Sequence, residues 1–126
     1  MIKLHELEKG NAANVMTERV EIYVPSTKNK REVILLTEQE HQDETFKTIT
    51  LFSSLFGGAT YETVVGAWTM QNGELVKERI NIVYSFSKTD ILKQHFMQVL
   101  EEAKRIKIKL GQEAVMVVVN CQAILV

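Results

Sequence analysis

The sequence predicts an α+β fold of the ferredoxin-like kind, with the element order β-α-β-β-α-β, a four-stranded antiparallel sheet and both helices on one face. Two β-rich runs meet at Asn72-Gly73, which indicates a hairpin in the middle of the chain. Helical patterns flank this hairpin on both sides, and strand patterns lie towards the two ends. Right-handed crossovers through the helices would then bring all four strands into one sheet.

The first strand is predicted over residues 17–24, where apolar and polar side chains alternate. We expect the preceding residues 1–16 to form an N-terminal arm and residues 17–126 to form a single domain, because residues 1–16 are only weakly periodic. A polar, basic loop with the sequence PSTKNKR follows the strand, and residues 32–36 read as a short strand extension.

The first helix is predicted over residues 38–56. Thr37 and Glu40 fit a capping box, in which the threonine oxygen accepts an N–H and the glutamate reaches back. Gly57-Gly58 would end this helix. Its apolar stripe would contain Phe46, Ile49, Phe52 or Ser53, and Phe56.

The hairpin is predicted to turn at Asn72-Gly73 through a two-residue type I′ turn, which needs φ > 0 at both positions. This register places Trp68 opposite Lys77 and Gly66 opposite Arg79. One face of the hairpin would then pack on the helices, and would include Glu78 among apolar residues.

The second helix is predicted from a cap at Ser87, Thr89 or Asp90 to Leu110, with Gly111 just beyond its end. The ion pair Glu101–Arg105 is expected on it. Residues 114–126 are predicted as one last strand that is apolar on both faces and continues through the single cysteine, Cys121.

Composition limits the classes of function. The 126 residues are 45% hydrophobic and 25% charged, with a net charge of −1, which is typical of a globular domain and argues against nucleic-acid binding by broad phosphate neutralisation. No apolar run approaches the about 20 residues of a membrane span, and the start lacks the apolar centre of a signal peptide. We therefore expect a cytoplasmic protein that binds neither membrane nor nucleic acid and needs no metal or other cofactor.

Several short motifs resemble a family of small bacterial and phage proteins whose domain has no assigned function. They are GGAT at 57–60, GAW at 66–68, GELVKER at 73–79 and GQEAV at 111–115. The resemblance covers roughly residues 17–126 and implies the same fold. It implies no catalytic residues.

A binding platform is predicted on the helix-free face of the hairpin. Trp68 and Lys77 could stack by a cation–π contact, and Gly66 would allow a ligand to approach closely. A solvated face or an oligomer interface is the alternative. The predicted platform consists of Trp68, Lys77, Arg79, Gly66 and Asn81.

Other titratable residues have two interpretations each. Glu78 is either a general base or ligand anchor, or a member of an ion pair at the end of the sheet. His95 is either a base or a partly buried histidine on the second helix. His41 could bind a metal with Glu38 and Glu44, although solvated acids are the commoner case.

Two functions remain open from the sequence. The first is a noncatalytic binding module that works as a homo-oligomer, a dimer or higher, through the sheet face opposite the helices. Its ligand would be a protein or a small anion, and an extension of this hypothesis is a phage or mobile-element accessory protein that inhibits or sequesters a host defence component. The alternative is a small-molecule enzyme of the dimeric α+β-barrel kind, with its chemistry carried by Glu78, His95, Tyr61 or Tyr84.

Overall fold

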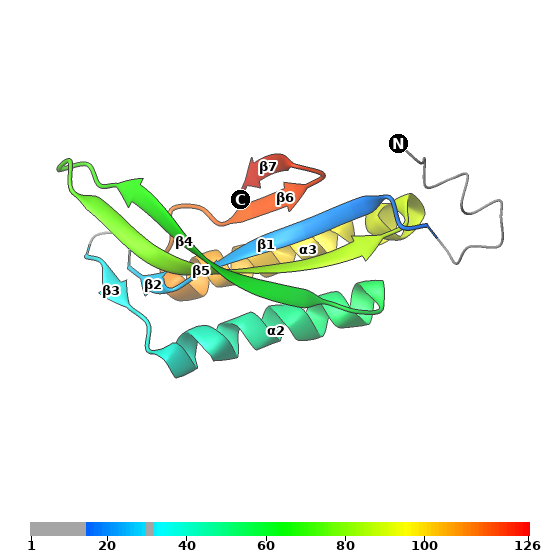
Figure 1. The fold of residues 1–126 in the computed structure, drawn as a ribbon, viewed down its shortest axis with the longest axis horizontal. Helices are drawn as coiled ribbons and strands as arrows, with labels where there is room; N and C mark the ends of the chain where they lie inside the picture. Colours follow the sequence, from blue (N-terminus) through cyan, green and yellow to red (C-terminus); the bar gives the residue numbers. More distant parts are fainter. Residues whose placement is uncertain (1–14, 30–31) are drawn as a thin grey trace.

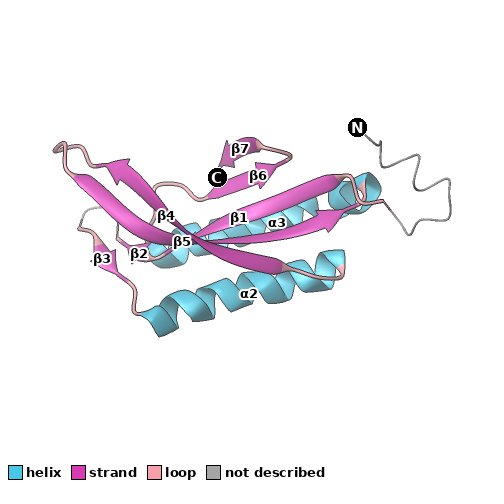
Figure 2. Cartoon of the chain, in the orientation of Figure 1, coloured by secondary structure: helices cyan, strands magenta, loops and turns pink. Residues whose placement is uncertain are grey.

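A computed structural model describes residues 15–29 and 32–126, in which one antiparallel sheet is covered on one face by two helices (Figures 1 and 2). The α+β class is thus confirmed. Nearly all of the predicted N-terminal arm lies outside the described residues. In chain order the elements are β1 (Glu18–Pro25), β2 (Thr27–Lys28), β3 (Ile34–Leu35), α2 (Glu38–Phe56), β4 (Thr60–Thr69), β5 (Leu75–Ser87), α3 (Thr89–Leu110), β6 (Met116–Val119) and β7 (Gln122–Leu125).

The main sheet has five strands in the order β4-β5-β1-β6-β7, not the four that were predicted. The additional strand arises because the last apolar run folds back on itself, so the prediction of one continuous strand is wrong. Asn120 and Cys121 form the turn, both with positive φ (50° and 67°). The Asn120 side chain accepts a hydrogen bond from the backbone N–H of Arg19 at 2.8 Å, which fastens this turn to β1.

The two helices begin and end close to the predicted residues. At the start of α2, Thr37 and Glu40 form both hydrogen bonds of the capping box, at 3.1 and 2.9 Å. Gly57 and Gly111 end the two helices in the left-handed conformation. The start of α3 differs from the prediction, because the capping position is Lys88 and its side chain makes no capping hydrogen bond.

The core lies between the sheet and the two helices. β1 contributes three side chains with no exposed surface, and both helices pack their apolar stripes against them. Over the described residues, no helix is long and apolar enough to cross a membrane. The fully buried apolar members of the core are Val20, Ile22, Val24, Phe52, Val83, Val99, Ala103, Ile106 and Val117.

The β4–β5 hairpin is present, but its loop is one residue longer than predicted. Met70 and Glu74 close the loop, since the N–H of Met70 donates to the carbonyl of Glu74 at 2.8 Å. The N–H of Gly73 donates to the carbonyl of Met70 at 2.9 Å, and Gly73 has φ +89°. Asn72 has no positive φ. These features identify a three-residue loop, a type I turn followed by a bulge at the glycine.

This extra loop residue corrects the predicted faces of the hairpin. Trp68 pairs with Val76 rather than Lys77, and Gly66 pairs with Glu78 rather than Arg79. A shift of one residue moves every side chain of a strand to the opposite face of the sheet. On β5 it is therefore the odd-numbered residues from 77 to 87 that face the helices.

Candidate functional site

A hollow of about 400 Å³ lies where the start of α2 meets the β4–β5 hairpin and the short β2–β3 ribbon. The ribbon is tied to the end of β1 by a hydrogen bond from the N–H of Leu36 to the carbonyl of Ser26 at 2.8 Å. Most of the side chains around the hollow are polar, and they come from separate parts of the sequence. Those able to donate, accept or carry charge are Ser26, Thr37, Glu38, His41, Gln42, Tyr61, Thr63, Lys77, Glu78, Arg79 and Asn81.

A buried chain of hydrogen bonds joins β4, β5 and α2 at this hollow. Asn81 accepts from the hydroxyl of Thr63 at 2.7 Å and donates to the hydroxyl of Thr45 at 2.9 Å. Thr45 in turn donates to the backbone carbonyl of His41 at 2.7 Å. Because buried polar groups that are satisfied hold one geometry, this chain fixes the hollow's wall. Asn81 was predicted on the helix-free face, but it lies on the helix side.

His41 lies in the first turns of α2, is buried and lines the hollow. Its Nε2 is 3.0 Å from the carbonyl oxygen of Val24. A carbonyl only accepts, so Nε2 carries the hydrogen and Nδ1 is the acceptor in the neutral ring. Among the described residues no fully buried side-chain nitrogen or oxygen lacks a partner, and Nδ1 has none, so Nδ1 is accessible. The histidine therefore offers a proton acceptor at this site.

Glu78 also borders the hollow and is largely buried. It pairs with Gly66 on β4, so the shift of register moves it out of the set of β5 residues that face the helices, where it was predicted. Its carboxylate accepts a hydrogen bond from the backbone N–H of Ser26 at 3.3 Å. The expected ion pair with an arginine or lysine is not formed within residues 15–29 and 32–126.

Lys77 and Arg79 line the same hollow from β5, and both are exposed. They are two residues apart on one strand, so their side chains leave the same face about 7 Å apart. In the described parts of the chain neither side chain has an ion pair or hydrogen bond. The hollow thus has two unneutralised cations at its edge.

The predicted platform is divided between two faces. Trp68 and Gly66 lie on the helix-free face, whereas Lys77, Arg79 and Asn81 lie on the helix side. The expected stacking of Trp68 on Lys77 is therefore wrong. The space beside Gly66 is filled by Ile80, whose Cδ1 would be 2.5 Å from an added Cβ, and not left free for a ligand.

The helix-free face has a cation–π contact of its own. The guanidinium of Arg19 lies 3.8 Å from the ring centre of Tyr84 and pairs with Glu21 at 3.0 Å. Tyr84 lines a second hollow, of about 390 Å³, beside Phe56 and Phe86. His95, on α3, has its ring centre 6.4 Å from that of Phe56, whereas Glu78 borders the first hollow. The alternative set of Glu78, His95 and Tyr84 is thus not brought together.

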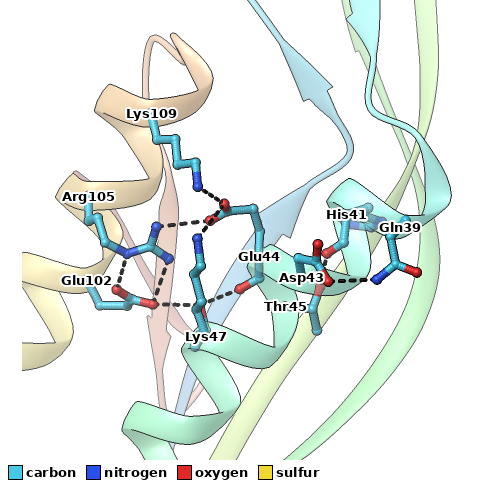
Figure 3. Close-up of polar contacts among 10 residues, drawn as sticks. Gln39, His41, Asp43, Glu44, Thr45, Lys47, Glu102, Arg105 and Lys109 are labelled. Carbon is cyan, nitrogen blue, oxygen red and sulfur yellow. Dashed lines mark hydrogen bonds and ion pairs between the residues drawn. The ribbon is translucent and has the colours of Figure 1, made fainter.

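The acids next to His41 do not complete a metal site with it. Figure 3 shows Glu44 pointing from α2 towards α3, where it pairs with Arg105 at 2.9 Å and Lys109 at 2.5 Å. Arg105 also pairs with Glu102 at 2.7 Å, and not with Glu101 as predicted. Over the described part of the chain, no group of three or more potential metal ligands is present.

Comparison with known proteins gives likenesses of structure and not of sequence. No family model matches the chain, and no curated protein matches its sequence. Two solved structures share its fold: phage SAM lyase in complex with S-methyl-5′-thioadenosine, and phage SAM lyase in the apo state. Each has a TM-score of 0.63 and 17% identity over 92% of this chain, covering 93% and 95% of the respective neighbour.

These neighbours correct the functional prediction. The expectation of a noncatalytic binding module is contradicted, because the two solved structures reported above are those of a lyase. The alternative of a small-molecule enzyme is the better supported of the two. The resemblance to the bacterial and phage family of unassigned function stays a prediction, and His41, Tyr61 and Thr63 are site residues that the predicted platform did not include.

Proposed function

We propose that this chain is an enzyme that breaks down SAM (S-adenosylmethionine) and releases S-methyl-5′-thioadenosine. The observation that carries the proposal is the likeness to phage SAM lyase, which extends over 92% of the chain with a TM-score of 0.63. S-Methyl-5′-thioadenosine is SAM without its four-carbon amino-acid portion, so a single bond must break between sulfur and that portion.

Cleavage of this bond needs few catalytic groups from the protein. The sulfur of SAM is a positively charged sulfonium, and when its bond to Cγ breaks the electron pair stays on sulfur and gives a neutral thioether. A lyase adds no water, so the four-carbon fragment either loses a proton from Cβ and becomes an unsaturated amino acid, or closes to a lactone through its own carboxylate. Holding the substrate in a reactive conformation therefore supplies much of the rate.

The hollow beside α2 is our proposed site. Its volume of about 400 Å³ lies within the about 300–1,000 Å³ usual for small-molecule sites. Glu38 and Glu78 provide negative charge to favour the sulfonium, and the aromatic ring of Tyr61 lies at its edge. His41 is the group suited to accept the Cβ proton, because its Nδ1 is an unpartnered acceptor.

The test is to incubate the purified protein with SAM and follow both compounds by chromatography and mass spectrometry. We expect loss of SAM to be matched by release of S-methyl-5′-thioadenosine, above the rate without protein. S-Adenosylhomocysteine is the control, since its neutral sulfur is a poor leaving group and it should stay intact. Loss of SAM no faster than in buffer would overturn the proposal, and the mass of the four-carbon product identifies the route.

We further propose that the fold is ferredoxin-like. Without the short ribbon and β7, the remaining elements follow the order β-α-β-β-α-β, and the sheet order β4-β5-β1-β6 is the one that this plan requires. A cytoplasmic location fits the proposed substrate, which cells make and use in that compartment.

A homo-oligomer through the helix-free sheet face is also proposed. Phe86 and Trp68 on this face are 49% and 38% exposed, and apolar surface of this kind favours burial. Val118, on the same face, is already covered within one chain, so the last strand contributes less to the argument than its sequence suggested. Sedimentation should give a dimer or higher species that Phe86→Asp dissociates and Met97→Asp, on the exposed side of α3, does not. A wild-type monomer at micromolar concentration would refute it.

A further inference from the structure

Lys77 and Arg79 present an arrangement that the proposed reaction does not by itself explain. The described residues include three arginines, of which Arg19 and Arg105 each pair with carboxylates at 3.1 Å or closer. Arg79 has no such partner in residues 15–29 and 32–126. Lys77 shares its face of β5 and is likewise without a partner there. Two like charges about 7 Å apart repel each other, so an anion between them would be favoured.

The position of Lys77 and Arg79 limits the class of anion that they can bind. Both side chains are exposed at the edge of the hollow of about 400 Å³ and belong to its lining. The other charged groups of that lining are Glu38 and Glu78, while His41 has its Nε2 hydrogen held by the carbonyl of Val24. The formal charges of the lining therefore cancel. A ligand with both a carboxylate and positive charge matches such a lining better than a polyanion would.

We infer that Lys77 and Arg79 bind the α-carboxylate of the substrate's methionine portion, so that SAM lies with its amino-acid end towards the β4–β5 hairpin. This inference rests on the proposed function. The planar guanidinium of Arg79 can donate two parallel hydrogen bonds to a carboxylate, and the ammonium of Lys77 adds a point charge. Glu38 and Glu78 then remain for the α-ammonium and the sulfonium.

The inference predicts that Lys77 and Arg79 affect the binding of two related ligands differently. S-Adenosylhomocysteine keeps the amino-acid end, whereas S-methyl-5′-thioadenosine lacks it, and both carry the same nucleoside and a neutral sulfur. If Lys77 and Arg79 act on the carboxylate alone, only the first ligand depends on them. The product would leave more easily than the substrate, because it has no group for the cations to hold.

Calorimetric titration of the full chain with these two ligands tests the inference. We expect Arg79→Gln and Lys77→Gln each to weaken S-adenosylhomocysteine binding about 10- to 100-fold, in line with the loss of a charge-assisted hydrogen bond. Binding of S-methyl-5′-thioadenosine should change less than twofold. Lys104→Gln, an exposed lysine on α3, is the control for the change in net charge and should alter neither.

The other possible results of the titration distinguish failure of this inference from failure of the proposed function. If wild type binds both ligands and the two variants weaken them equally, or weaken neither, the carboxylate assignment is wrong and the proposed function stands. If wild type binds neither ligand and does not consume SAM, the proposed function fails and the inference fails with it. Melting curves of the variants should match wild type, because both side chains are exposed.

Discussion

Replacing Glu44 with glutamine should destabilise the protein by about 1–2 kcal/mol at neutral pH. Glu44 is 4% exposed, and three cations converge on its carboxylate: Arg105 at 2.9 Å, Lys109 at 2.5 Å and Lys47 at 3.4 Å. An amide carries no charge and would turn two hydrogens towards these donors. The three cations are 35–52% exposed, and Arg105 keeps Glu102, so water and that pair offset part of the loss.

Thermal unfolding followed by circular dichroism measures this effect. A loss of 1–2 kcal/mol corresponds to a fall in Tm of about 3–8 °C for a domain of this size. Glu101→Gln is the matched control, because Glu101 lies on α3 beside the network and is exposed. It should change the Tm by no more than about 2 °C.

The same variant makes a prediction about pH. Burial would raise the pKa of Glu44, but hydrogen bonds from Lys109 and Arg105 outweigh it and hold the pKa below its ordinary value of 4.5. A carboxyl whose pKa is lower in the folded state stabilises the fold fully above its unfolded pKa, and that contribution is lost as the pH falls through the folded pKa. The difference between wild type and Glu44→Gln should therefore shrink as the pH falls below about 4.5. No difference at neutral pH, or one that stays constant on acidification, would refute the reasoning.

Three further changes test the turn, the core and the site. Gly73→Val puts a β-branched residue at φ +89° and should lower the free energy of unfolding in a urea melt by about 1–3 kcal/mol. Gly58→Ala, which has open space around it, should leave that free energy nearly unchanged. Equal effects of the two changes would contradict the turn. Phe52→Ala should lower the free energy of unfolding by about 3–5 kcal/mol in the same melt. Phe46→Ala should lower it much less, because Phe46 is 46% exposed. Similar losses would mean that the core lies elsewhere. His41→Gln keeps a donor for the carbonyl on β1 but loses Nδ1, so SAM cleavage should fall about 100-fold or more; an unchanged rate would mean that the fragment closes on its own carboxylate without a protein base.

The helices could be predicted because their signals are local. The capping box of Thr37 and Glu40, and the glycines at 57 and 111, mark the ends of α2 and α3 within one turn of chain. Each signal acts through hydrogen bonds between residues three to five apart, so no knowledge of the rest of the fold is needed. The start of α3 could not be predicted in this way, because Lys88 takes the capping position although better capping residues flank it.

The last hairpin had no comparable signal. Its turn places Cys121 at φ 67°, a conformation that cysteine seldom adopts, in a run of apolar residues typical of one strand. The turn is supported from a distance, by the two hydrogen bonds between Asn120 and the backbone of Arg19. A contact between residues about a hundred positions apart is not visible in local sequence patterns.

His41 illustrates the same limit at the site. In the sequence it stands among acids at the start of a helix, which favours a solvated position. In the structure the packing of α2 on the sheet brings its ring to the end of β1, where the carbonyl of Val24 holds Nε2. The ring lines the hollow, with Nδ1 left as its acceptor, only because those two elements meet.

The position of the two cations depends on one residue of the hairpin loop. Asn72-Gly73 fits a two-residue turn, but it fits equally the end of a three-residue loop, because both need the glycine at positive φ. With the shorter loop, Lys77 and Arg79 would share the helix-free face with Trp68. With Gln71 included in the loop, they share the helix side with Asn81, whose hydrogen bonds to β4 and α2 fix that side. The candidate site is therefore a consequence of register, which the β1–β5 pairing enforces over eight residues and the turn sequence alone does not.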